Sequence, residues 1–115
     1  MPELNEPLER FIEEYVDSFV KWDLITYFHN NAGVFDSSHS LAVHLGRKES
    51  DIKKALRELA DKNLVTEIKE NGGDVYQYTP SVGISEMVEN FVKALEIREK
   101  RLLILTKLLR MGVRE

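Results

Sequence analysis

Apolar side chains in residues 38–65 repeat with the spacing of two short helices separated by a turn. The first apolar group is followed by Gly46, a residue that adopts the positive φ of a helix C-terminus without steric strain. In the second group, apolar side chains recur at intervals of four and three residues, so they share one helical face. These side chains are Ile52, Leu56 and Leu59. The pattern predicts helices over residues 38–45 and 49–62.

The preceding stretch carries a similar helical pattern from Leu8 to Phe28. Pro7 suits a first helical turn, because proline lacks only an N–H that would be unpaired there. The polar face of this stretch consists of Glu9, Glu13, Glu14 and Asp17. We expect an N-terminal helix over residues 6–20 and a second helix over residues 23–31, which ends at Asn30, Asn31 and Gly33.

Three short extended segments are predicted around the helix pair. Val34 and Phe35 suit a very short strand, and the polar residues after them suit a helix N-cap. Residues 65–69 and 75–79 are rich in β-branched and aromatic side chains. The Asn71-Gly72 pair between them favours a hairpin turn.

A long apolar helix is expected after Pro80, beginning at Ser81 or Ser85 and ending near Arg110. It would span about 26 residues and ~39 Å. Its stripe at alternating four- and three-residue spacing comprises Ile84, Val88, Phe91, Leu95, Leu102, Leu105 and Leu109. Further side chains widen that stripe, namely Leu103, Ile104 and Leu108. Because so long an apolar surface overhangs a small domain, we expect this helix to form a homodimer interface.

Two parts of this pattern resemble known regulators. The order Ala-x-x-Leu-Gly, Ile-x-x-x-Leu-x-x-Leu, Leu-Val over residues 42–65 resembles the helix-turn-helix of bacterial and archaeal winged-helix regulators. The run Tyr-Gln-Tyr-Thr at residues 76–79, followed by Gly83 and a helix, resembles the wing exit of multiple-antibiotic-resistance-type and phenolic-acid-type regulators. The resemblance implies a mainly α fold with a small β-hairpin wing and a second helix that enters the DNA major groove. It also implies dimerisation through the C-terminal helix.

The length of 115 residues suits one winged-helix domain over residues 1–115. Its expected parts are an N-terminal helix (1–22), a winged-helix core (23–80) and a C-terminal helix (81–115). The chain contains no cysteine, which excludes disulfides and thiolate metal sites. The acidic N-terminus lacks the apolar segment of a signal peptide, and no apolar run approaches the ~20 residues of a membrane span. A cytoplasmic protein without a membrane partner is therefore expected.

Charge is distributed unevenly along the chain. The net charge of −4 does not favour a nucleic-acid partner. However, residues 1–23 alone carry a net charge of −5. Residues 47–69 carry seven basic and five acidic side chains, and residues 96–115 carry six basic and three acidic ones. The predicted helix-turn-helix is thus mildly basic, which is compatible with double-stranded DNA as a partner.

The candidate DNA-contacting residues lie in and around the predicted second helix. They are Ser38, Ser40, Arg47, Lys48, Ser50, Lys53, Lys54, Arg57 and Lys69. Lys53, Lys54 and Arg57 are opposite the apolar face, where they can reach guanine edges or phosphates. Ser38 and Ser40 begin the preceding helix and are expected to bind a phosphate with its free N–H groups. The residues expected to hold the DNA backbone are Arg47, Lys48 and Lys69.

Alternatives to DNA binding remain at this stage. Glu49 and Asp51 in the first helical turn would repel phosphates, so a protein-docking winged helix is the second hypothesis. No constellation supports an enzyme, a metal site or a cofactor, since the histidines lack the spacing of a metal pair. These histidines are His29, His39 and His44. Four aromatic side chains would either fill the core or line a pocket for a small apolar effector, namely Tyr15, Phe19, Trp22 and Phe91.

Overall fold

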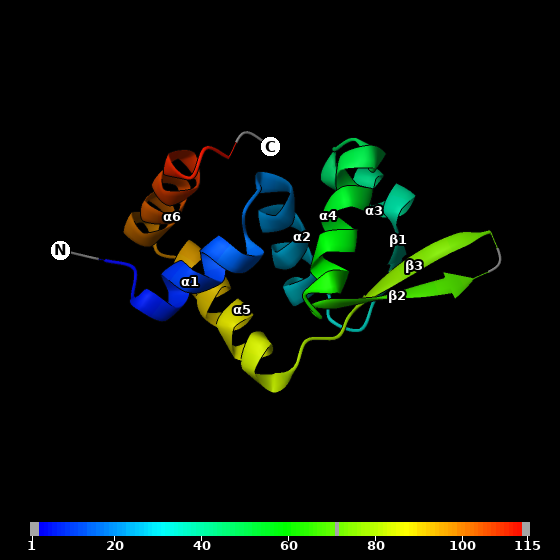
Figure 1. Ribbon diagram of the computed structural model, residues 1–115, viewed down its shortest axis with the longest axis horizontal. Coiled ribbons are helices and arrows are strands. Elements are labelled where there is room, and N and C mark those ends of the chain that lie inside the picture. Colours follow the sequence, from blue (N-terminus) through cyan, green and yellow to red (C-terminus); the bar gives the residue numbers. More distant parts are fainter. Residues whose placement is uncertain (1–2, 71, 114–115) are drawn as a thin grey trace.

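A computed structural model describes residues 3–70 and 72–113, which form six helices and three strands (Figure 1). The helices are α1 (Glu6–Tyr15), α2 (Phe19–Asn30), α3 (Ser38–Leu45), α4 (Glu49–Asp61), α5 (Val82–Leu95) and α6 (Arg98–Arg110). The strands are β1 (Phe35–Ser37), β2 (Val65–Glu70) and β3 (Gly73–Tyr78). The expectation of a mainly helical protein with a small antiparallel sheet is confirmed.

The boundary between α1 and α2 differs from the prediction. Helix α1 ends at Tyr15, and α2 already begins at Phe19, four residues before the predicted start. The Ser18 side chain accepts a hydrogen bond from the backbone N–H of Lys21 at 3.1 Å and caps α2. A serine cap inside the apolar pattern therefore divides what periodicity alone predicted as one helix to residue 20.

The turn between α3 and α4 agrees with the prediction. Helix α3 has the predicted bounds and is capped by Ser37, whose hydroxyl accepts from the Ser40 N–H at 3.1 Å. Gly46 has a φ of +66°, and the backbone N–H of Arg47 donates to the carbonyl of Ala42 at 2.9 Å. Asn63, with a φ of +61°, lies just beyond α4 in the same left-handed conformation.

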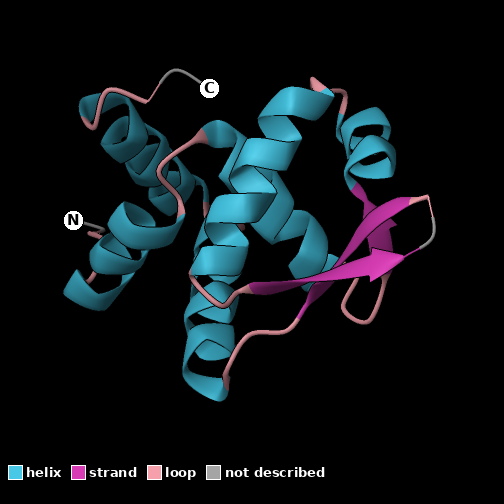
Figure 2. Cartoon of the chain, turned by 45° about the vertical axis from the view of Figure 1, so that its right-hand side comes forward, coloured by secondary structure: helices cyan, strands magenta, loops and turns pink. Residues whose placement is uncertain are grey.

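The three strands form one antiparallel sheet in the order β1-β3-β2. Val65 of β2 lies opposite Tyr78, and Phe35 of β1 lies opposite Gln77. The β2–β3 hairpin extends beyond the helices (Figures 1 and 2). Asn71, which was expected to shape its turn, lies outside the described residues.

The hydrophobic core draws on every helix and on the sheet, with α2 packed against α4, α5 and β3. The largest fully buried side chains are Phe11, Ile12, Leu24, Ile25, Phe28, Leu41, Ile52, Leu56, Leu59, Leu64, Phe91 and Ile104. The N-terminal helix α1 packs against α5 of the C-terminal region. The core therefore holds α4 by one face, with its opposite face exposed.

The prediction of one long C-terminal helix is wrong. The chain forms α5 and α6, separated at Ile97, whose φ of −98° and ψ of 116° are extended. The guanidinium of Arg101 donates to the Leu95 carbonyl at 2.8 Å and satisfies one end of α5. Because of the break, Ile104 and Leu108 are buried within the same molecule. In one continuous helix these two side chains would extend beyond the domain.

This break also divides the residues predicted to form the dimer interface. Val88 and Phe91 are 0% exposed and lie in the core, so a partner does not reach them in this conformation. Ile84 and Leu95 are half-buried against that core. The exposed members are on α6, namely Leu102, Leu105 and Leu109. None of the six described helices has the length and hydropathy required to cross a bilayer.

Candidate nucleic-acid interface

The exposed face of α4 carries the basic side chains that the sequence predicted. Lys53, Lys54 and Arg57 are exposed there, while Ile52 and Leu56 on the opposite face are fully buried. Ser50 is also exposed, in the first turn of α4. The amphipathic pattern alone thus places these basic groups correctly, because burial of the apolar face fixes the rotation of the helix about its axis.

A hollow joins this face to α3 and to the hairpin. The residues that line it are Ser37, Ser38, His39, Glu49, Lys53, Arg57, Gly72, Gly73, Asp74 and Tyr76. Lys53 and Arg57 therefore lie beside Ser38 at the start of α3 and beside Tyr76 in β3. Lys54 lies on the other side of α4, in a second hollow next to Lys21. The fold brings Ser38, Lys53 and Arg57 together although they come from two different helices.

Several predicted DNA-contacting residues are paired with carboxylates instead. The Arg47 guanidinium lies 2.6 Å from the Asp23 carboxylate on α2. The Lys69 ammonium lies 3.6 Å from Glu67 and 3.9 Å from Asp74. Arg47 therefore holds the α3–α4 turn against α2 and is less available to DNA than predicted.

The two serines at the start of α3 also have acidic partners. The Ser40 hydroxyl donates to Asp36 at 3.3 Å, and the Ser38 hydroxyl donates to Glu49 at 3.3 Å. Ser38 is 7% exposed, so its hydroxyl is largely withdrawn from solvent. Three basic residues of the candidate interface form no ion pair with any described residue. They are Lys48, Lys54 and Arg57.

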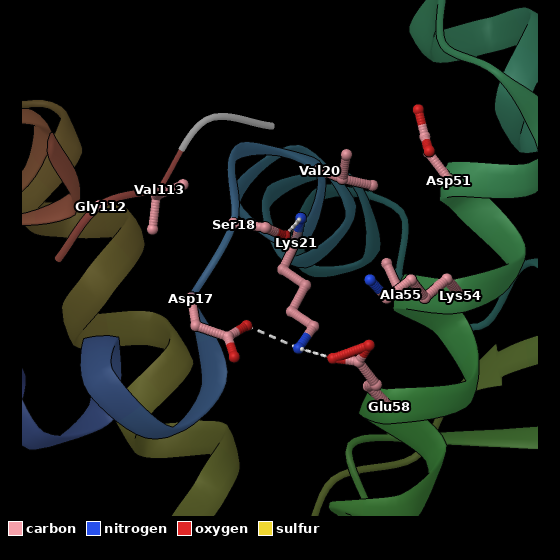
Figure 3. A pocket seen from close by; sticks show the side chains of 10 residues that line it. All are labelled: Asp17, Ser18, Val20, Lys21, Asp51, Lys54, Ala55, Glu58, Gly112 and Val113. Carbon is pink, nitrogen blue, oxygen red and sulfur yellow. Dashed lines mark hydrogen bonds and ion pairs between the residues drawn. The ribbon is translucent and has the colours of Figure 1, made fainter.

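Lys21 holds α4 against the start of α2, a role that sequence reasoning missed. It is 5% exposed, and its ammonium lies 2.6 Å from the Asp17 carboxylate and 2.8 Å from that of Glu58 on α4. Figure 3 shows the Lys21 side chain reaching both carboxylates. Burial alone lowers the pKa of Lys21, but hydrogen bonds to the two carboxylates outweigh it and raise that pKa. The signal was a lone lysine in an apolar stretch, four residues after an aspartate.

Two tyrosines connect the elements around the hollow. The Tyr27 hydroxyl of α2 donates to Asp36 at 2.6 Å, and this hydrogen bond, with burial, raises the pKa of Tyr27 to about 12. Burial and a 2.9 Å hydrogen bond to Glu67 raise the pKa of Tyr76 to about 12, although Arg57 opposes that rise. Both hydroxyls remain protonated donors near neutral pH. Tyr27 joins α2 to β1, whereas Tyr76 joins β3 to β2 within the sheet.

Of the four aromatic side chains considered for an effector pocket, Phe91 lies in the core and the other three are half-buried against it. Phe91 is fully buried, and its ring centroid lies 6.1 Å from that of Trp22 in an edge-on contact. Trp22 in turn lies 5.9 Å from Phe19, and Tyr15 stacks on Phe11 at 5.1 Å. Phe19, Trp22 and Phe91 thus pack together as the core alternative predicted, whereas Tyr15 also lines a mainly apolar hollow between α1 and α5, beside Pro7 and Ile84.

The histidines do not converge on a common point. His39 is exposed at the start of α3, whereas the His44 ring lies 5.0 Å from that of Tyr27. In the part of the chain that the structure describes, no group of three or more His, Cys, Asp or Glu side chains is arranged to hold a metal ion.

Comparison of the chain with protein-family models, with curated proteins and with solved structures found no match. Functional assignment therefore rests on the geometry of the chain itself.

Proposed function

We propose that the protein is a homodimeric winged-helix transcriptional regulator that binds double-stranded DNA. In this proposal α4 enters the major groove and the β2–β3 hairpin is the wing. The observation that carries the proposal is the outward face of α4. Lys53, Lys54 and Arg57 project from a helix that is held by its buried face and by the Lys21–Glu58 ion pair.

The roles of the basic residues follow from their partners. Arg57 and Lys54 are the principal DNA contacts, because they are exposed and no described carboxylate pairs with them. In this proposal Lys48, the N-cap residue of α4, contacts a phosphate. Lys69 on the hairpin contributes a further phosphate contact once it leaves Glu67 and Asp74.

A second copy of the chain is expected to pack on α6. Leu102, Leu105 and Leu109 are 49%, 37% and 58% exposed and recur on one helical face. A two-fold dimer would present two α4 helices to a symmetric site, and the linked half-sites would raise the overall affinity.

The proposal is tested by titrating a fluorescently labelled random-sequence duplex with the protein at several salt concentrations. We expect binding that weakens steeply with salt, because phosphate contacts release counterions. The variant Lys54→Ala/Arg57→Ala should raise Kd roughly tenfold or more and lower the salt slope by about 2, with little change in Tm.

The matched control is Arg10→Ala/Lys93→Ala, which removes the same charge from exposed positions on α1 and α5. Its Kd should stay close to that of the wild type. An unchanged Kd in the α4 variant would remove this face from the mechanism.

The second candidate function is a winged-helix module that docks a protein. The observation that favours it is the pairing of Arg47, Lys53 and Lys69 with carboxylates on a chain of net charge −4. The same titration separates the two functions. A folded protein that does not bind the duplex even at low salt would favour protein docking.

A further inference from the structure

Glu49, in the first turn of α4, faces the start of α3 across the hollow of the candidate interface. Its Oε1 atom accepts a hydrogen bond from the Ser38 hydroxyl at 3.3 Å and lies 3.8 Å from the Lys53 ammonium. Its Oε2 atom lies 3.8 Å from Nδ1 of His39. One carboxylate therefore faces three side chains that line the same hollow.

These side chains are of the kinds that bind DNA phosphates. A hydroxyl and an ammonium donate to phosphate oxygens, and an imidazole does so when its facing nitrogen is protonated. A carboxylate presents the same type of charged acceptor oxygen, so it competes for the same donors. The Glu49 side chain is 42% exposed, which leaves it free to move away when another anion approaches.

We infer that Glu49 is an internal competitor for a DNA phosphate. In the free protein its carboxylate accepts from Ser38 and lies beside Lys53, so a phosphate that approaches Lys53 competes with it. This inference rests on the proposed DNA-binding function and deepens it, because it assigns to one residue an opposing effect on affinity. Glu49 thereby favours sites whose base contacts offset the displacement, and disfavours binding through phosphates alone.

The test compares Glu49→Gln with Asp51→Asn in the duplex titration. Asp51 lies in the same first turn of α4 but lines a different hollow, beside Lys54, and the three donors pair with Glu49. Its variant therefore measures the effect of an acidic charge in this turn that does not compete for those donors. Glu49→Gln should lower Kd for a random duplex roughly three- to tenfold at low salt. Its salt slope should become steeper by about 1, because Lys53 becomes available to a phosphate. Asp51→Asn should change Kd less and leave the slope unchanged.

A third variant, Glu86→Gln on the exposed surface of α5, controls for net charge and should bind as the wild type does. Equal gains in affinity for Glu49→Gln and Asp51→Asn would overturn the inference in favour of simple repulsion. Weaker binding by Glu49→Gln would overturn it as well, since Glu49 would then support the interface. If neither the wild type nor any of the three variants binds the duplex at low salt, the proposed function fails and the inference fails with it. This outcome is distinct from the previous two.

Discussion

Asp36 shows how one carboxylate can organise the start of α3. It accepts hydrogen bonds from the Tyr27 hydroxyl at 2.6 Å and from the Ser40 hydroxyl at 3.3 Å. The first bond joins α2 to β1, and the second joins β1 to α3. Because the phenol donates to a charged acceptor, this bond is stronger than one between neutral groups.

The Tyr27 hydrogen bond should be visible as a dependence of stability on alkaline pH. The pKa of Tyr27 rises from its ordinary 10.0 to about 12 in the folded protein. The stabilisation is therefore complete below pH 10 and is lost as the pH rises toward 12. Tyr27→Phe should lose about 1 kcal/mol of unfolding free energy at neutral pH. Its stability should then decline less than that of the wild type between pH 10 and 12.

Urea unfolding followed by circular dichroism at several pH values measures both effects. Tyr15→Phe is the control, because the Tyr15 ring stacks on Phe11 and its hydroxyl bonds to none of the described residues. Tyr76 and Lys21 also have raised pKa values, so part of the alkaline decline should persist in the Tyr27 variant. A decline as steep as that of the wild type would contradict the assigned role.

At the scale of elements, two glycines illustrate different backbone requirements. Gly46 ends α3 with a φ of +66°, in the left-handed region that other residues enter with strain. Gly83 lies in the first turn of α5, where the backbone is helical and other residues adopt it without strain. A Cβ atom added at either position meets no atom within 4 Å. The two positions therefore differ in backbone conformation and not in available space.

Alanine substitutions at these positions should change stability in opposite directions. Gly46→Ala should lower the free energy of unfolding by about 1–2 kcal/mol, because alanine must adopt the left-handed conformation. Gly83→Ala should raise it by about 0.5 kcal/mol, because alanine restricts the unfolded chain and suits a helix. Chemical denaturation of the two variants beside the wild type gives both values. A stabilised Gly46→Ala would show that the α3–α4 turn does not depend on this backbone conformation.

At the scale of the whole molecule, α4 lies between the candidate dimer helix α6 and the β2–β3 hairpin (Figure 1). The molecule measures 52 × 29 × 21 Å, with α6 toward one end of the longest axis and the β2–β3 hairpin at the other (Figure 1). Helix α2 lies between the two groups of elements and contacts both α4 and α5. Pairing through the leucines of α6 would therefore leave the hairpin uncovered, whereas Lys54 of α4 shares a hollow with Gly112 and Val113, which follow α6.

Charged substitutions on α6 should separate the dimer without unfolding the chain. Leu102→Glu/Leu109→Glu places two like charges on the exposed stripe, so the proposed dimer should dissociate and bind DNA more weakly. Sedimentation equilibrium gives the mass, and circular dichroism reports the fold. Val82→Glu, at a 78% exposed position on α5, is the control and should remain dimeric. A dimeric double variant would place the interface elsewhere, whereas a monomeric wild type would contradict the proposed dimer.

Local sequence signals predicted the helix pair and the hairpin well. The bounds of α3, the positive φ of Gly46 and the outward face of α4 all depend on neighbouring residues in the chain. Each of these features follows from side-chain periodicity or from the conformational freedom of one residue type. These two signals are local and do not depend on distant contacts.

The sequence by itself thus determined the class and order of the elements as far as the hairpin, and the face that the short amphipathic helix α4 buries. The tertiary structure decided where α5 ends, because the gain from burying Ile104 and Leu108 depends on α1 and α5 already being packed. It also decided which basic groups stay free, since Asp23 reaches Arg47 only after α2 packs near the α3–α4 turn. Periodicity reports one helix at a time, whereas burial and ion pairing depend on groups brought together from distant parts of the chain.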